Sequence, residues 1–443
     1  MMASRKSCPT DNTNLLGVDP YAVDVNDTDS DDGIHPKVSS YPRRSYSRPL
    51  IDYVKNEWQN NPKYRILSQS SSPDRELPQG IRLLLSIITA PKFRRYLIVY
   101  AVLLTTCFIG WKGILSPRLK ENAALLKSLD PQTRELVGGW FGTNALPKFS
   151  DLVQIRTLDP SLLPGDVPLK ANDRNKRRLI IVGDVHGCKD ELDRLLEKVS
   201  FNHENGDHLI FTGDMINKGP QSLAVVDLAR KYRASCVRGN HEDRILLLRN
   251  EMKATNMLSE PSGNEVDGKP TNSISLLDHN ERTLARRLSD EEAEWLDGCP
   301  VILKVGQIKG MGQVVVVHGG LVPGVELERQ DPSSVMSMRT IDLATHVPSS
   351  SKKGMPWTKL FNKHQSLLFA SLKKSVPDPQ SRVTTVIYGH DASSSLNIKK
   401  YTKGLDTGCV NGGKLTALVI EDGGKQSIVQ VRCRDYTSIR ERE

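Results

Sequence analysis

Five short motifs that carry histidine and aspartate follow one another in the second half of the chain. They read GDVHG at 183–187, GDM at 213–215, GNHE at 239–242, HGG at 318–320 and GHD at 389–391. Aspartate and histidine are suitable ligands for metals such as zinc, iron and manganese. Two adjacent divalent ions that share a carboxylate can cleave phosphate esters and anhydrides. One such motif would be a weak signal, but five in order predict a dinuclear metal centre that acts on phosphate compounds.

Six side chains are the expected metal ligands. They are Asp184 and His186 for the first ion, Asp214 as the bridge, and Asn240, His318 and His390 for the second ion. An asparagine ligand supplies an oxygen without charge, so it limits the negative charge that faces an anionic substrate. A single histidine here would be better interpreted as an ordinary core or loop residue. The complete set favours the metal centre.

The motifs stand at the ends of apolar runs that predict buried strands. Expected strands cover 179–182, 209–211, 235–237, 301–305, 314–317, 383–388, 415–420 and 428–431, and expected helices cover 191–198, 222–232, 245–252 and 290–296. Ser289 and Glu292 form the capping-box pattern that opens the last of these helices. Open α/β sheets place their ligand sites at the C-terminal ends of strands. The order of strands and helices predicts a layered α/β sandwich.

The N-terminal part of the chain differs in composition from the part that bears the motifs. Residues 1–91 hold an acidic run and then a basic run rich in serine and proline, which together predict a disordered tail. The apolar run at 96–111 carries no charge. At about 1.5 Å per residue it spans roughly 24 Å, slightly less than the ~30 Å hydrocarbon core. We therefore expect a transmembrane signal anchor over 92–114, with a buried soluble helix as the alternative.

Charge around the apolar run indicates an orientation. Lys92, Arg94 and Arg95 before it favour a cytoplasmic tail and a catalytic part on the far side of the membrane, although Lys112 and Arg118 after it weaken this inference. The remaining expected segments are a stalk over 115–175, a catalytic domain over 176–434 and a C-terminal tail over 435–443.

Composition constrains the partners and the cysteine chemistry. The formal net charge of +9 suggests an anionic partner without identifying it. Seven cysteines are an odd number, and they form no CxxC pair. We therefore expect neither a disulfide framework nor a cysteine-based zinc site. Cys188 and Cys409, near the expected metal centre, are interpreted as packing residues.

The motifs GDVHG, GDMINKG, GNHED, HGG and GHD together resemble the calcineurin-like metallophosphoesterases. More narrowly they resemble the branch that contains phosphoprotein phosphatases and diadenosine tetraphosphatases. The run at 405–415 is similar to that branch's closing strand motif, and 337–339 is similar to its substrate-binding arginine segment. The resemblance covers roughly 178–432. It implies a four-layer α/β/β/α sandwich in which a hydroxide bridging two metals attacks phosphorus.

The same resemblance implies roles for residues outside the ligand set. His241 would be the general acid that protonates the leaving oxygen, and Arg238 and Arg339 would hold phosphate oxygens. Most protein phosphatases of the branch carry Asp-Arg where this chain has Asn217 and Lys218. Asparagine has no charge and should support a protonated histidine less well than aspartate does. Lysine offers a mobile point charge in place of a bidentate guanidinium.

This departure from the family pattern bears on the substrate. Cleavage of an anhydride releases phosphate, whose second pKa of about 6 means that it needs little protonation. Asn217 and Lys218 therefore predict a phosphoanhydride substrate. Neutral drift, or a local rearrangement in which another carboxylate serves His241, is the alternative.

The tail, the anchor and the GDMINKGP segment at 213–220 resemble the fungal vacuolar endopolyphosphatases of this family. That resemblance implies two zinc ions (with manganese, cobalt or iron as other candidates), a vacuolar lumenal site and cleavage of internal bonds of inorganic polyphosphate. No nucleic-acid partner is expected. Lysine pairs at 352–353, 373–374 and 399–400 could guide a polyanion. A serine/threonine phosphoprotein phosphatase, a dinucleoside tetraphosphatase and a membrane scaffold pseudoenzyme remain open as alternatives.

Overall fold

The computed structural model describes residues 78–130, 152, 154–166, 176–255, 258 and 273–437. Residues 1–77 of the predicted tail and residues 438–443 at the other end lie outside this description, as does most of 131–175 of the predicted stalk. The predicted tail and domain boundaries therefore stay predictions over these segments.

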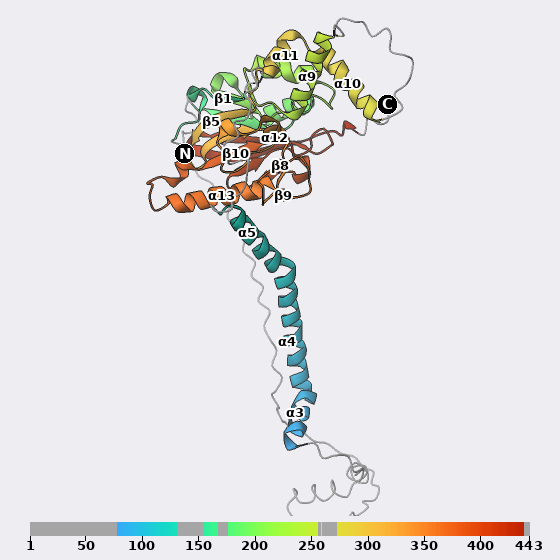
Figure 1. Ribbon diagram of the computed structural model, residues 1–443, viewed down its shortest axis with the longest axis vertical. Helices are drawn as coiled ribbons and strands as arrows, with labels where there is room; N and C mark the ends of the chain where they lie inside the picture. Colours follow the sequence, from blue (N-terminus) through green and yellow to red (C-terminus); the bar gives the residue numbers. More distant parts are fainter. Residues whose placement is uncertain are drawn as a thin grey trace, which may run out of the picture. The chain divides into compact units, whose positions relative to one another are not determined.

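Two mixed sheets form the centre of the part that bears the motifs (Figure 1). The six-stranded sheet has the order β1 (Ile155–Thr157), β5 (Ile302–Ile308), β6 (Gly312–Val317), β10 (Thr384–Tyr388), β12 (Thr402–Gly404) and β11 (Asn397–Ile398). The five-stranded sheet has the order β14 (Lys425–Arg432), β13 (Lys414–Glu421), β2 (Arg178–Val182), β3 (Asp207–Phe211) and β4 (Ser235–Cys236). A small sheet joins β8 (Pro348–Ser349), β7 (Thr340–Ile341) and β9 (Met355–Pro356). The predicted α/β class is confirmed.

Helices pack on the sheets, and Figure 1 shows α9 to α11 on one side of the stacked sheets and α13 on the other. The helices of this part are α5 (Ser116–Ser128), α7 (Lys189–Lys198), α8 (Ser222–Lys231), α9 (Asn240–Ala254), α10 (Ser273–Arg287), α11 (Asp290–Asp297), α12 (Pro332–Ser337) and α13 (Trp357–Leu372). The predicted capping box is present, since Ser289 Oγ accepts from Glu292 N–H at 3.1 Å and Glu292 Oε2 accepts from Ser289 N–H at 2.7 Å.

Three apolar clusters hold these layers together. One lies between the two sheets and draws on both, with Ile181 and Ile210 from one sheet and Val316 and Ile387 from the other. A second joins the five-stranded sheet to α7, α8, α9 and α11, and a third joins the six-stranded sheet to α12, α13 and the end of α5. Strands of both sheets are buried on two faces. Their sequences are therefore continuous runs of apolar residues rather than an alternation of apolar and polar residues.

The segment expected to be a stalk contributes to the folded part. Strand β1 pairs in parallel with β5. Helix α5 packs Leu125 into the third apolar cluster, and Glu121 makes an ion pair with Lys359 of α13 at 2.5 Å. Helix α5 packs on a sheet-covering helix through few apolar side chains, so the sequence gives little sign that it belongs to the folded part.

The apolar run lies in a long helix. Helix α4 (Pro91–Gly110) continues through a π-helical turn, Trp111–Leu115, into α5, and the combined helix Pro91–Ser128 has a mean hydropathy of 1.8 in its most apolar window, with none of that window buried. It is the one helix among the described residues that is long and apolar enough to cross a membrane. Helix α3 (Gln79–Thr89), at the end of the predicted disordered tail, has no buried side chain.

Candidate metal centre

The candidate ligands follow the C-terminal ends of strands from both sheets. Asp184 follows β2, Asp214 follows β3, His318 follows β6 and His390 follows β10, while Asn240 begins α9 just after β4. Strands β2, β3 and β4 are mutually parallel, and so are β6 and β10. Their C-terminal ends therefore bring five motifs to one edge of the sandwich, which is why residues more than 200 positions apart converge.

Asp214 lies at the centre of the cluster. Its Oδ2 is 3.2 Å from His318 Nε2, 3.6 Å from His186 Nε2 and 3.9 Å from His241 Nε2. Asn240 Oδ1 is 3.1 Å from His318 Nε2. A carboxylate between two groups of potential ligands is the geometry expected of a bridge.

Three of the histidines are oriented by backbone carbonyls. The pairs are His186 Nδ1 with Ile216 O at 3.3 Å, His318 Nδ1 with Thr212 O at 2.8 Å, and His390 Nε2 with Ser337 O at 2.9 Å. A carbonyl only accepts, so each of these nitrogens carries a proton. The other nitrogen of His186 lies 3.1 Å from Lys218 Nζ, and that of His318 lies 3.1 Å from Asn240 Oδ1. Metal-binding histidines are oriented in this way.

The charges of the cluster also fit cations. Burial, with Asp406 nearby, raises the pKa of Asp184 well above its usual range. Burial opposes protonation of His318, but Asp214 and Asp184 outweigh it and raise its pKa to about 10. Ligand atoms of His186, Asp214 and His241, and those of Asp214, His318 and His390, lie within 4.8 Å of one another. A buried cluster of carboxylates and imidazoles that otherwise needs protons for charge balance suits two divalent ions.

The backbone around Asp214 is held tightly. Glu242 accepts from the N–H groups of Asp214, Met215 and Gly239 at 2.7, 2.8 and 3.0 Å. The φ angles of Asp214, His186, Asn217, Lys218 and His390 are positive, between 48° and 72°. Such conformations are costly for residues with a side chain and persist where surrounding contacts enforce them.

His241 has an unusual partner. Its Nδ1 lies 2.9 Å from Asn217 Nδ2, and the same Nδ2 donates to Glu281 Oε1 at 3.0 Å. Burial, with Lys218 nearby, lowers the pKa of His241 to about 4 against the opposing effect of Asp214. The imidazole is therefore neutral near pH 7. The sequence anticipated the uncharged Asn217 but gave no signal for Glu281, which comes from α10.

A cavity of about 250 Å³ opens over the cluster. Lys218, Arg339 and Lys352 contribute its positive charge. Arg339 is held at the rim by donating to His390 O at 3.2 Å and Ser350 O at 3.1 Å. A second cavity of about 490 Å³ shares Lys218 with the first and is also lined by Asn217.

Two expectations about basic residues do not match this geometry. Arg238 is buried, does not line the cavity, and pairs with Asp297 at 2.5 Å and Asp243 at 3.4 Å. These two carboxylates occupy the guanidinium that was expected to hold phosphate. Of the three lysine pairs, only Lys352 lines the cavity, while Lys400 stacks over Phe369.

The expectation of no disulfides is wrong. Cys236 bonds to Cys299 and Cys409 bonds to Cys433, across 63 and 24 residues. The fold brings these pairs together, so local spacing gave no hint, and the odd total arose because Cys8, Cys107 and Cys188 do not belong to these pairs. Cys188 is a buried free thiol, as the packing interpretation expected.

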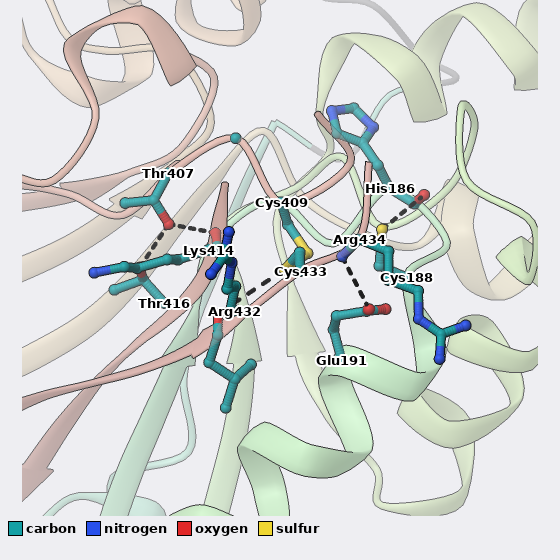
Figure 2. The surroundings of a disulfide bond; sticks show 12 residues. His186, Cys188, Glu191, Thr407, Cys409, Lys414, Thr416, Arg432, Cys433 and Arg434 are labelled. Atoms are coloured by element: carbon teal, nitrogen blue, oxygen red, sulfur yellow. Dashed lines mark hydrogen bonds between the residues drawn. A yellow bond between two sulfur atoms is a disulfide. The ribbon is translucent and has the colours of Figure 1, made fainter. Parts of the chain in front are cut away.

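Both disulfides lie next to segments that build the site. Figure 2 shows the disulfide between Cys409 and Cys433, which joins the loop after Thr407 to the chain beyond β14. Cys188 and His186 are drawn beside this disulfide. That loop supplies Asp406 and Asn411 to the cavity wall. Cys236 ends β4, four residues before Asn240.

Comparisons with known proteins identify a matching family and several similar proteins. Residues 177–394 match the family model described as calcineurin-like phosphoesterase. A zinc-dependent endopolyphosphatase of Saccharomyces cerevisiae is 30% identical over 301 residues, which are 62% of this chain and 87% of that protein. A symmetrical bis(5'-nucleosyl)-tetraphosphatase of Janthinobacterium is 25% identical over 58% of this chain and 96% of that protein. A crystal structure of a diadenosine tetraphosphatase-like protein, 28% identical, covers 64% of this chain and 99% of its own with a TM-score of 0.45.

Proposed function

This chain belongs to the calcineurin-like phosphoesterase family, and from that premise we propose that it hydrolyses phosphoanhydride bonds, with the internal bonds of inorganic polyphosphate as its substrate. The endopolyphosphatase relative supports this choice, and its zinc dependence supports zinc as the metal. Manganese, cobalt and iron are the other candidates.

Six residues would hold the two ions, with Asp184, His186, Asp214, Asn240, His318 and His390 as the set. When bound, two divalent ions lower the pKa of a water and offset charge on the phosphoryl group. The chain's own part is to position the reactants. Lys218 and Arg339 bind phosphate oxygens from opposite lining segments, and His241 presents its Nε2 toward the bond that breaks.

The observation that carries the anhydride proposal is the partner of His241. The ring meets a neutral amide at 2.9 Å, where a carboxylate would favour imidazolium. A neutral imidazole can donate a hydrogen bond from its Nε2–H but does not give up that proton near neutral pH. It suffices for a phosphate leaving group, whose second pKa is about 6, but gives little help to the alkoxide of serine.

The residues that line the cavities favour a polyanionic substrate over a dinucleotide. Among the described residues, neither cavity is lined by phenylalanine, tyrosine or tryptophan, which commonly stack on nucleobases. The second cavity holds Arg287 and continues past Lys218. A polyphosphate chain cut beside Asp214 therefore has space to extend on that side, as internal cleavage requires.

The test compares substrates on one preparation. The full-length protein, loaded with zinc, manganese or cobalt in turn, is incubated with long-chain polyphosphate, diadenosine tetraphosphate and a phosphoserine peptide. We expect fastest turnover of polyphosphate, with intermediate lengths on a sizing gel, and loss of that turnover in Asp214→Asn. Faster turnover of the peptide or the dinucleotide would refute the substrate assignment, and failure to bind any of the metals would favour the scaffold alternative.

We also propose that the catalytic part lies in an oxidising compartment across the membrane from the tail, with the vacuolar lumen as the site. The two disulfides support this, because such bonds are rare in the cytosol. Lys373→Asn offers a test, because it places an N-x-S acceptor before the exposed Ser375. We expect glycosylation at this new position and none at the native acceptor in the tail, Asn26; the reverse pattern would refute the orientation.

A further inference from the structure

A chain of contacts leads from His241 to a buried carboxylate outside the family motifs. Asn217 Nδ2 lies between His241 Nδ1 at 2.9 Å and Glu281 Oε1 at 3.0 Å. Glu281, on α10, is 4% exposed, and its Oε2 makes an ion pair with Arg244 Nε at 2.7 Å. Asn217 is also buried. Glu281 therefore contacts the side chain of Asn217, which in turn contacts His241.

The direction of each hydrogen bond follows from the groups involved. Asn217 Oδ1 accepts from the Lys218 N–H at 2.7 Å, so the amide oxygen already faces a donor. The Glu281 carboxylate only accepts, so it must face the amide NH2. Rotating the amide by half a turn would set oxygen against carboxylate and N–H against N–H. Glu281 and the Lys218 backbone thus hold Asn217 in one orientation.

That orientation determines where His241 carries its proton. An amide NH2 has two hydrogens. One goes to Glu281 and the other to His241 Nδ1, which must then accept. In a neutral imidazole the proton is left on Nε2. This nitrogen is the one 3.9 Å from Asp214 Oδ2, on the side of the cavity.

We propose that Glu281, acting through Asn217, is a positioning residue that fixes His241 in the tautomer whose Nε2–H points at the leaving oxygen. Arg244 neutralises Glu281, so the pair orients the amide without adding net charge near the ring. A direct carboxylate partner would instead favour imidazolium. The inference rests on the proposed role of His241 as hydrogen-bond donor to the leaving oxygen, and not on the identity of the substrate.

The first test is a double-mutant cycle on kcat with polyphosphate. Glu281→Ala frees the amide to rotate, and we expect kcat to fall at least tenfold with KM within twofold. The same substitution in an Asn217→Ala background should change kcat by less than twofold, because the connecting amide is gone. Glu281→Gln, which keeps an accepting oxygen, should retain more than a third of kcat. The proposal would be overturned if the losses of kcat from Asn217→Ala and Glu281→Ala multiplied in the double variant. It would also be overturned if Glu281→Ala and Glu281→Gln lowered kcat equally.

The second test separates a misplaced proton from a damaged fold. Across aryl phosphate monoesters, the rate should depend more steeply on the pKa of the leaving phenol in Glu281→Ala than in the natural chain, because good leaving groups need no proton. Parallel dependences would indicate general damage and overturn the proposal. Nitrogen-15 resonances of His241, identified by their loss in His241→Gln, should move from the Nε2–H toward the Nδ1–H pattern in Glu281→Ala.

Different results would refute the proposed role of His241 and the proposed role of Glu281. If His241→Gln leaves the dependence on the leaving phenol unchanged, the role of His241 as hydrogen-bond donor to the leaving oxygen is wrong. If His241→Gln steepens this dependence and Glu281→Ala does not, only the role of Glu281 is wrong.

Discussion

The uncharged Asn217 is suited to its neighbours, and an aspartate could not simply take its place. An aspartate there would set one carboxylate oxygen about where the amide nitrogen now donates to Glu281 at 3.0 Å. Two buried carboxylates this close repel, so Asn217→Asp should lower the free energy of unfolding by about 1–3 kcal/mol. Urea denaturation at pH 7 measures this.

A second substitution tests whether repulsion from Glu281 causes the loss of stability in Asn217→Asp. Glu281→Gln in the Asn217→Asp background replaces the repulsion with an amide that can donate to the new carboxylate. We expect it to restore most of the lost stability and to shift the preference from polyphosphate toward the phosphoserine peptide. A double variant as unstable as Asn217→Asp alone would contradict this account.

Arg287 provides a test of where the substrate extends. Its exposed side chain lines the second cavity, away from the candidate ligands. Arg287→Ala should raise KM for long-chain polyphosphate by about 3- to 10-fold, since one phosphate contact is lost, and leave KM for tripolyphosphate unchanged. Lys374→Ala, which removes an exposed charge outside both cavities, is the matched control. An equal effect on both chain lengths would place Arg287 outside the substrate path.

The single residues differ in how readily the sequence reveals them. The candidate ligands stand out in the sequence because each is next to a glycine and near the end of a strand. Glu281 and the pairing of Arg238 with Asp297 do not stand out, because they depend on how α10 and α11 fold back against α9. Packing between elements decides such contacts, and no local pattern encodes it.

At the level of elements, apolar runs predicted the buried strands well. Helix α13 was missed, although Trp357, Leu360 and Phe361 recur at helical spacing and are buried. Its polar face carries lysines and a histidine, and the short strands before it gave no clear start. Two-residue strands such as β7 and β9 have too little sequence for any periodicity, so their pairing comes from the tertiary fold.

The pairing of β3 with β4 carries a pH dependence. His208 of β3 is buried with Nε2 at 2.9 Å from Ser235 Oγ, and burial, with His203 nearby, lowers its pKa from 6.5 to about 4. Between these two values the unfolded chain binds the proton and the folded chain does not. His208 therefore lowers stability progressively as pH falls from 6.5 to 4, by roughly 1.4 kcal/mol per pKa unit.

Melting temperatures between pH 7 and pH 4 test this contribution. His208→Gln has no group that titrates in this window, so its melting temperature should fall less steeply with acid than that of the natural chain. The difference in melting temperature between the two proteins should appear below about pH 6.5 and become constant near pH 4. Parallel profiles would show that His208 is not the group responsible.

Across the whole molecule, α5 belongs to the folded part rather than to a free stalk. Leu125 is 7% exposed within an apolar cluster, and Ser128 meets His346 Nε2 at 2.6 Å. Leu125→Ala should lower the free energy of unfolding by about 2–3 kcal/mol. Leu126→Ala, at 42% exposure, should change it by less than about 0.5 kcal/mol. Equal effects would mean that α5 does not dock through Leu125.

The disulfides couple the site to the redox state of its surroundings. Reduction of Cys409–Cys433 would release the loop that supplies Asp406 and Asn411 to the cavity wall. We expect a reductant to lower polyphosphate turnover and to reduce stability by about 2–4 kcal/mol per bond. The variant Cys409→Ser with Cys433→Ser should show part of this loss before any reductant is added, whereas Cys107→Ser should behave like the natural chain.

Alkylation under denaturing conditions gives an independent measure of the same state. In protein isolated without reductant from the cells that make it, Cys107 and Cys188 should react without reductant, because both are free thiols. The four paired cysteines should react only after reduction. If they react beforehand, the catalytic part resides in a reducing compartment, and the bonds that hold the walls of the cavity do not form there. Protection of all four, together with loss of activity on reduction, would tie catalysis to an oxidising compartment.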